Sequence, residues 1–525
     1  MKVDRNRLTG FFLHLTLWVC TASADDWLQY RGPNHNAVST EHINTQWTGS
    51  VTNPVWLVYL TNGLTSLTIS DGRAFTQVGG DFTPSGSYLL AHKEFCVALS
   101  ASNGDVLWQT EIDALGTSAS LNPRLFPNGG VGYTDDGPRS TPVVDGGSVY
   151  VLSSYLKLYR LNATNGAVIW STNLVAGFGG SVIAWQNAAS PVFEDGLVFV
   201  NANCSTSNLM AFHASDGTLA WRAQDGGMTH ATPVLATIHG VRQLIFITQS
   251  GLVSLNPQTG DVLWRFVYPY NGTSLAASPM VCDDIVFITA SYGTGSAAVQ
   301  VAYSNSTFSA SELWHDQSLQ SHWTTPVCYQ GAMFGQFTPD NANAELRCVD
   351  LATGATMWSV GGFGRGAPML IDTNLVVITE RGELVLALAQ TNAYAELARF
   401  TAIPDYQDAY NKCWNALALS DGQLYVRSTA YAARFDLSLP GQLMIEPPQL
   451  AAGNTLQFTI LTATGTPIDA NRLAGIELRA SSDISLPPSQ WPALTNDLLL
   501  TNGVLFVTNV ATGPQQRYFI VAEPD

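Results

Sequence analysis

Short apolar runs recur along this chain, separated by turns rich in Gly, Asp, Asn and Pro. One unit repeats. It opens with a Ser/Thr-Pro pair (Ala-Pro in the copy at Ala367) and a short apolar strand, turns into a second strand, and ends in tryptophan about 30 residues later. The opening prolines stand 42 to 49 residues apart, at Pro142, Pro191, Pro233, Pro279, Pro326 and Pro368. A period of this length with about four short antiparallel strands per unit is typical of a β-propeller blade.

The closing tryptophan follows a glycine by four residues in five of the units. The glycines are Gly104, Gly166, Gly217, Gly260 and Gly354, and the tryptophans are Trp108, Trp170, Trp221, Trp264 and Trp358. Trp314 closes a degenerate copy. Glycine at this place suits a tight turn with positive φ between two strands. We predict that the tryptophans pack between neighbouring units.

The units predict an all-β fold with eight blades. The first begins with the strand at Ser66, and the last, which begins near Asn415, lacks its outer strand. An unassigned strand over 53–60 precedes the repeats, and pairing it with the last unit would close the ring and protect an exposed edge. Trp56 would then take the eighth tryptophan position.

The repeat also divides the chain. We expect a signal peptide over residues 1–24, an eight-bladed β-propeller over 25–440 and a small β-sandwich-like module over 441–525. Two insertions, 79–92 and 113–138, flank the first blade, and such insertions are usually functional loops on one face.

Composition narrows the possible partners. The 23 Lys and Arg residues against 40 Asp and Glu give a net charge of −17, and charged residues make up only 12% of the chain. This charge argues against nucleic acid and against anionic membrane surfaces.

The first 24 residues have a basic start, a short apolar stretch and the small-residue pattern Ala22-Ser23-Ala24. The chain is therefore expected to be exported, to the periplasm or beyond, with no integral membrane segment. Six cysteines follow, which allow 15 pairings or buried free thiols, and the sequence leaves these open: Cys96, Cys204, Cys282, Cys328, Cys348 and Cys413.

Three motifs carry a family resemblance: DWLQYRGPNHNAVS from Asp26, GPRSTPVVDGGSVY from Gly137 and TERGELVLA from Thr379. With the tryptophan repeats, they resemble exported PQQ-like (pyrroloquinoline quinone repeat) propeller proteins of the planctomycete and verrucomicrobial type. The wider superfamily implied is that of the quinoprotein dehydrogenases. Those enzymes hold PQQ and calcium on the propeller axis with a stacking tryptophan, a disulfide between adjacent cysteines and an aspartate base. This chain has no adjacent cysteines.

The residues just before each innermost strand are expected near the axis, at one mouth of the channel. Counted three before each proline, or its equivalent, they are Leu64, Arg139, Ala188, His230, Ala276, Trp323, Arg365 and Trp414, with Asn187, His322 and Lys412 beside them. Two arginines, a histidine and two tryptophans on one ring suit an anionic or planar ligand. The candidate ligand-binding residues are Arg139, His230, His322, Trp323, Arg365 and Trp414.

Structural roles compete with each assignment. Arg139 sits near Asp135 and Asp136 and could pair with them, and His230 could be a hydrogen-bonded structural histidine. Trp323 and Trp414 could fill the channel, and Arg365 lies between glycines. The leading interpretation is a non-catalytic exported scaffold that binds a ligand or protein partner through its axial funnel, with no cofactor or metal assigned. The alternative is a PQQ- and calcium-dependent alcohol or sugar dehydrogenase with a divergent site.

Overall fold

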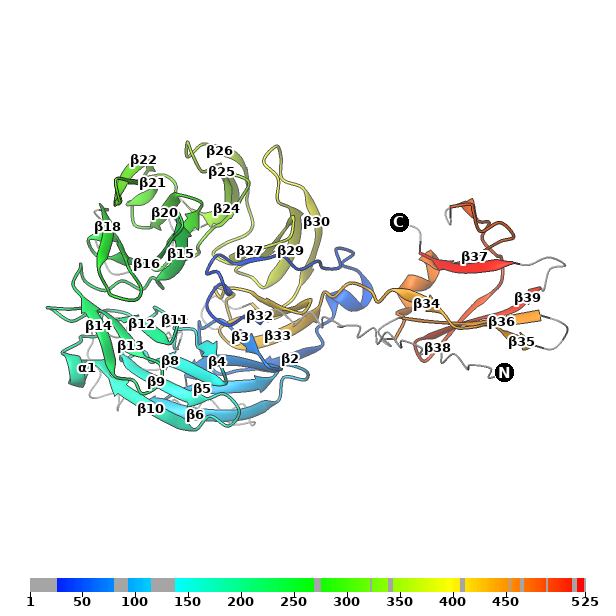
Figure 1. Ribbon diagram of the computed structural model, residues 1–525, viewed down its shortest axis with the longest axis horizontal. Helices are drawn as coiled ribbons and strands as arrows, with labels where there is room; N and C mark the ends of the chain where they lie inside the picture. The colour runs from blue at the N-terminus through cyan, green and yellow to red at the C-terminus, as the bar shows by residue number, and fades with distance from the viewer. Residues whose placement is uncertain are drawn as a thin grey trace, which may run out of the picture.

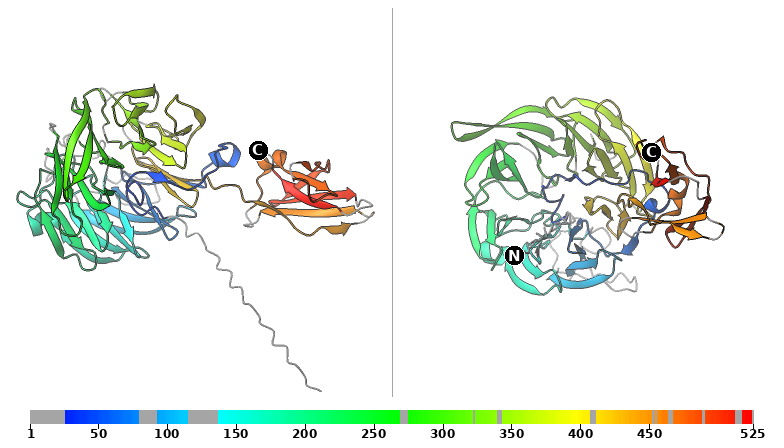
Figure 2. Two further views of the ribbon diagram at one scale, coloured as in Figure 1. Left: turned by 45° about the horizontal axis from the view of Figure 1, so that its top comes forward. Right: turned by 45° about the vertical axis from the view of Figure 1, so that its right-hand side comes forward.

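The computed structural model describes residues 26–79, 93–114, 137–268, 275–321, 323–338, 343–406, 411–451, 453, 455–462, 467–487, 490–511 and 517–523. Over these residues the chain is all-β and forms a β-propeller, in which successive sheets follow one another around a ring (Figures 1 and 2). Within the described ranges the ring contains eight sheets, each built on four antiparallel strands. The predicted signal peptide lies outside these ranges, as do almost all of the two predicted insertions.

Seven of the sheets are continuous in sequence. They are β3–β6 (Thr68–Ser70, Arg73–Gly79, Lys93–Ser100, Val106–Ala114), β7–β10 (Val143–Asp145, Ser148–Leu152, Lys157–Asn162, Val168–Asn173), β11–β14 (Val192–Glu194, Leu197–Asn201, Leu209–His213, Leu219–Ala223), β15–β18 (Val234–Ile238, Val241–Thr248, Gly251–Leu255, Val262–Val267), β19–β22 (Met280–Cys282, Ile285–Ala290, Gly295–Ser304, Thr307–Asp316), β23–β26 (Val327–Tyr329, Ala332–Phe337, Glu345–Asp350, Thr356–Val360) and β27–β30 (Ala367–Ile371, Asn374–Ile378, Glu383–Leu388, Glu396–Thr401). A short helix, α1 (Leu174–Phe178), follows β10.

The eighth sheet joins the two ends of the ring. Strands β31–β33 (Ala418–Ser420, Gln423–Arg427, Tyr431–Asp436) are completed by β2 (Trp56–Tyr59), which runs antiparallel to β33 with Trp56 opposite Arg434. The predicted closure by the strand over 53–60 is therefore confirmed. Strand β2 thus covers the edge that β33 would otherwise leave unpaired.

The repeated tryptophans lie between neighbouring sheets, as predicted. The indole of Trp108 donates a hydrogen bond to the Ala163 carbonyl, and its ring lies against Gly166, whose φ is 72°. The same arrangement recurs for Trp56 with Gly104, Trp170 with Gly217, Trp221 with Gly260 and Trp314 with Gly354. Each glycine therefore meets two demands, a left-handed backbone and space for the indole of the preceding sheet.

At five places around the ring, a Ser or Thr hydroxyl at the start of an inner strand also bridges neighbouring sheets. This hydroxyl accepts a hydrogen bond from the equivalent backbone N–H of the sheet before it. The bonds run from Ser66 to Thr141 (3.0 Å), Thr141 to Ser190 (2.9 Å), Ser190 to Thr232 (2.9 Å), Ser278 to Thr325 (2.8 Å) and Ala416 to Ser66 (2.9 Å). The last of these crosses the closing seam. At these places the hydroxyl supplies the acceptor that a buried N–H requires.

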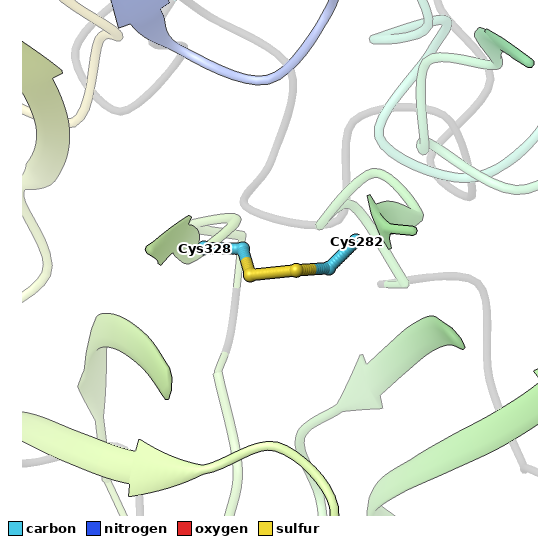
Figure 3. Close-up of a disulfide and its surroundings, with 2 residues drawn as sticks. All are labelled: Cys282 and Cys328. Atoms are coloured by element: carbon cyan, nitrogen blue, oxygen red, sulfur yellow. A yellow bond between two sulfur atoms is a disulfide. The ribbon is translucent and has the colours of Figure 1, made fainter. Parts of the chain in front are cut away.

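One disulfide, between Cys282 and Cys328, links the first strands of two neighbouring sheets, β19 and β23 (Figure 3). Cys96, Cys204, Cys348 and Cys413 are free and buried. Burial raises the pKa of the Cys348 thiol to about 11, so it is protonated and unreactive at neutral pH.

Residues 26–39, which we call the strap, lie against the first strands of several sheets (Figure 2, right, dark blue). The short strand β1 (Val38–Ser39) pairs in parallel with β27. The backbone of the strap is also hydrogen-bonded to the first strands of three sheets: Trp27 with Ile69, Leu28 with Val144 and Ala37 with Leu370. The strap is the DWLQYRGPNHNAVS motif, and its contacts tie together sheets on opposite sides of the axis.

Arg31 anchors the strap. Its side chain is 2% exposed, and its guanidinium donates to the carbonyls of Thr325 and Pro326, each at 2.7 Å, and to that of Asn36 at 3.0 Å. Burial lowers the pKa of Arg31 to about 10, so it stays charged at neutral pH. Carbonyl oxygens thus satisfy its donors.

Residues 443–522 form the strands predicted beyond the repeat. Strands β34 (Leu443–Ile445), β35 (Gln449–Ala451), β36 (Thr455–Thr462), β38 (Leu498–Thr501) and β39 (Val504–Ala511) make one sheet, and β37 (Glu477–Ser481) pairs with β40 (Tyr518–Ala522). They enclose a core that includes Phe458, Ile460, Leu478 and Leu505. In Figure 1 these strands lie to one side of the ring.

The packing of tryptophan on glycine can be tested with two alanine substitutions. A Cβ at Gly166 would lie 2.6 Å from the Trp108 ring, whereas Gly196, with a similar φ of 77°, has nothing within 4 Å of its Cβ position. Gly196→Ala should lower the free energy of unfolding by about 1–2 kcal/mol, from backbone strain alone. Gly166→Ala should cost about 1–3 kcal/mol more, from overpacking. Chemical denaturation measures both, and equal losses would contradict an indole contact of this kind.

A buried histidine in the strap, His35, should make the free energy of unfolding depend on pH. His35 is 4% exposed and contacts Gln29, and burial, with Arg242 and Arg31 nearby, lowers its pKa to about 3. Below about pH 6.5 the unfolded chain binds a proton at His35 that the folded chain does not. The free energy of unfolding should therefore fall by about 1.4 kcal/mol for each pH unit between 6.5 and 4.

The matched variant is His35→Asn, because asparagine tolerates the φ of 56° at this position. It should flatten the pH dependence of unfolding over this range, measured by denaturant titration at pH 7.0, 5.5 and 4.5. An unchanged dependence in the variant would rule out His35 as the source.

Candidate functional site

Three of the predicted site residues lie in contact at one mouth of the ring. Trp323, Arg365 and Trp414 come from the turns that precede the first strands of three successive sheets. The two indole rings are 4.1 Å apart between centroids and tilted by 41°, and the Arg365 guanidinium lies 5.2 Å from the Trp323 ring and 4.9 Å from the Trp414 ring. Residues from equivalent positions meet here because the ring brings the turns of adjacent sheets together.

Lys412 completes this group, with its Nζ 4.0 Å from the centre of the Trp414 ring. Cations favour the negative face of an indole, so Arg365 and Lys412 both gain from the tryptophans. We call Trp323, Arg365, Lys412, Trp414 and the acid described next the mouth cluster. Its indoles and the Arg365 side chain are partly exposed, whereas Lys412 is 8% exposed.

The acid is Glu380, which holds the cluster in place. It is 8% exposed, and its Oε1 accepts hydrogen bonds from the Trp414 indole at 2.8 Å and from Arg365 Nη2 at 3.1 Å. Its Oε2 accepts from the backbone N–H of Arg365. Arg365 and Glu380 form an ion pair at 3.1 Å, and Lys412 adds a second cation on the Trp414 ring, in a chain whose net charge is −17.

Two other predicted residues, Arg139 and His230, lie outside the mouth cluster. Arg139 donates to the Trp185 carbonyl at 3.1 Å, and the His230 ring lies 3.0 Å from the Ala184 carbonyl. Both therefore contact the turn that precedes the first strand of the sheet between theirs. This contact is a structural role, and whether either residue also reaches a ligand stays a prediction. His322 lies outside the described residues.

That turn presents an aromatic side chain that the sequence analysis missed. Trp185 and Gln186 have φ values of 66° and 63°, a left-handed conformation that is unfavourable for residues other than glycine, and Trp185 is 39% exposed. Arg139 and His230 bind the turn from either side. Two consecutive strained residues of this kind are typical of functional turns.

Glu380 was also missed, although it lies in the TERGELVLA motif. The signal available was an acid two residues after the end of β28 (Asn374–Ile378), next to the arginine of that motif. No periodicity pointed to it, because the equivalent positions in other units do not carry an acid.

A metal site is not evident in these ranges. Among the described residues, no three His, Cys, Asp or Glu side chains gather in a way that could hold a metal ion. At the mouth cluster the single carboxylate, Glu380, is already bonded to Trp414 and Arg365. The donors present there do not fit a calcium ion, which needs six to eight oxygen ligands.

A family of proteins described as outer membrane protein assembly factor BamB matches residues 92–360. This chain belongs to that family. BamB of Yersinia pestis is 31% identical over 124 residues, which are 24% of this chain and 26% of that protein. BamB of Moranella endobia is 23% identical over 306 residues, 56% of this chain and 60% of that protein. The tetrathionate hydrolase of Acidithiobacillus ferrooxidans is 21% identical over 301 residues, 54% of this chain and 49% of the enzyme.

The chain therefore spans between about a quarter and three fifths of the curated relatives it matches. Among solved structures, the quinohemoprotein alcohol dehydrogenase of Comamonas testosteroni aligns with a TM-score of 0.53 at 13% identity, over 86% of this chain and 84% of the enzyme. BamB of Moraxella catarrhalis aligns with a TM-score of 0.48 at 16% identity, over 73% of this chain and 97% of that chain. The dehydrogenase alignment establishes a shared propeller fold between a BamB-family chain and an enzyme.

Removing the acid of the mouth cluster should destabilise it. Glu380→Gln removes the carboxylate that pairs with the Arg365 guanidinium and accepts from the Trp414 indole, and the free energy of unfolding should fall by about 1–3 kcal/mol. The matched variant is Glu396→Gln in β30, because Glu396 also pairs with an arginine, Arg399, but on the exposed face. It should cost less than about 1 kcal/mol. Similar losses measured by denaturant titration for the two variants would mean that Glu380 is not needed to neutralise the cluster.

Proposed function

We propose that this chain is an exported, non-catalytic scaffold whose eight sheets are the blades of one closed propeller, and that its mouth binds a ligand or protein partner through a planar, negatively charged group. The mouth cluster carries the proposal. It brings two indole rings together with an arginine and a lysine, and these side chains suit such a group.

The family supports the same role. Its described name is that of an outer membrane protein assembly factor, which supports a protein partner and a location outside the cytoplasm. The part of the chain that the structure describes contains no helix with the length and hydropathy of a membrane span. We further propose that residues 1–24 are a signal peptide, that 25–440 form the propeller and that 441–525 are an accessory module. Nucleic acid stays an unlikely partner on charge grounds.

A divergent PQQ- and calcium-dependent dehydrogenase is the other function that the fold allows. The propeller similarity to the dehydrogenase shows the fold alone, and fold does not carry function. Because the mouth cluster does not fit calcium, we rank the binding scaffold first. Whether ligand binding requires calcium distinguishes the dehydrogenase from the binding scaffold.

The test is calorimetric titration of the full chain with PQQ, a planar tricarboxylate, and with citrate, a tricarboxylate that is not planar. We expect PQQ to bind with a Kd of about 100 μM or tighter without calcium, and citrate at least about tenfold more weakly. Arg365→Ala should weaken PQQ binding at least about tenfold, since it removes a charged partner.

Arg139→Ala is the matched control, an arginine at the same mouth but outside the cluster, and it should retain most of the affinity. Binding that requires calcium would favour the dehydrogenase. An Arg365→Ala variant with unchanged affinity would show that the mouth cluster is not the site.

A further inference from the structure

Arg381 and Tyr406 form a cation–aromatic pair beside the mouth cluster, and we call them the rim pair. The guanidinium carbon of Arg381 lies 5.1 Å from the centre of the Tyr406 ring. Arg381 directly follows Glu380 in the turn between β28 and β29, and Tyr406 lies in the segment between β30 and β31. That segment also carries Lys412 and Trp414. The rim pair therefore comes from the same two parts of the chain as three members of the mouth cluster.

Backbone hydrogen bonds join these two parts of the chain on both sides of Arg381. The Cys413 N–H donates to the carbonyl of Glu380 at 3.0 Å. The Ala402 N–H donates to the carbonyl of Gly382 at 2.8 Å. Because Glu380 and Gly382 flank Arg381 in sequence, these bonds fix the backbone of Arg381 next to the mouth cluster.

The charge of Arg381 is not balanced by the part of the chain that the structure describes. Its side chain is exposed, and within the described ranges its guanidinium has neither an ion pair nor a hydrogen bond and contacts a ring instead. Arg399 provides the contrast, because its guanidinium lies 5.2 Å from the centre of the Phe363 ring. Two carboxylates, those of Glu383 and Glu396, also pair with that guanidinium.

An aromatic ring and an acid hold an arginine in different ways. A ring attracts the guanidinium to its face and leaves both its charge and the N–H donors in its plane available. An acid neutralises the charge and occupies those donors. A guanidinium that is positioned but not neutralised matches a carboxylate, which it can bind with two parallel hydrogen bonds. Arg381 is therefore suited to an anion from outside the chain.

We propose that the rim pair binds a carboxylate of the mouth ligand, so that this ligand is a polyanion with at least two separate carboxylates. The inference rests on the function proposed above, because the planar part of the ligand would lie on the mouth cluster. Arg381 then takes the second negative charge.

The test compares two ligands that share a planar ring system and differ in charge. Naphthoate has one carboxylate, and the corresponding naphthalene dicarboxylate has another at the opposite end of the rings. In calorimetric titrations of the full chain, the dicarboxylate should bind at least about tenfold more tightly, because a second charge-assisted pair forms. This advantage should shrink as sodium chloride is added, since Arg381 is exposed and salt screens its pairing.

Variants of the rim pair test which side chains carry the advantage. Arg381→Gln should remove it and leave the affinity for naphthoate unchanged. Tyr406→Phe keeps an aromatic ring and should retain the advantage, whereas Tyr406→Leu should reduce it. Arg399→Gln is the matched control, an arginine over a ring that is already paired with carboxylates, and it should also retain the advantage.

Two outcomes would overturn the inference and leave the proposed function intact. One is equal affinity for the two ligands, with both weakened by Arg365→Ala. The other is an advantage of the dicarboxylate that persists in Arg381→Gln. If neither naphthalene ligand binds, the inference also fails, and the titration with PQQ decides the proposed function separately.

Discussion

A tryptophan of one sheet against a glycine of the next is the contact on which the ring depends. The indole of Trp108 lies where any side chain at Gly166 would stand, and the same pair recurs around the ring. Because most of these indoles also donate to a carbonyl of the next sheet, the contact fixes both the distance and the rotation between neighbours. Because these contacts repeat around the ring, they fix the positions of the turns at its mouth. These turns carry the residues of the mouth cluster.

Much of this architecture could be predicted from the sequence because a repeat shows its own register. The spacing of the prolines defined the units, and the incomplete last unit predicted the pairing of β2 with β33. The same register selected Trp323, Arg365 and Trp414, which lie in contact because they occupy equivalent positions. Their role in binding a ligand is a separate matter that position alone does not decide.

What the repeat does not encode could not be predicted in this way. Glu380 joins the mouth cluster from the end of a second strand, where the other units carry no acid. Arg139 and His230 contact a neighbouring turn through backbone carbonyls, and a carbonyl has no sequence signature. The strap lies outside the repeat, and only tertiary contacts show that Arg31 is buried across the axis.

The closure of the ring also orders the events of folding. Strand β2 lies near the start of the chain, and its partner β33 is some 375 residues further along. A chain made from its N-terminus must keep the edge of β2 unpaired until nearly the whole ring has been synthesised. Contacts so distant in sequence form slowly, and an apolar edge exposed for that time invites aggregation. Chaperones that bind unfinished chains would therefore encounter β2 as an exposed strand before it closes the ring.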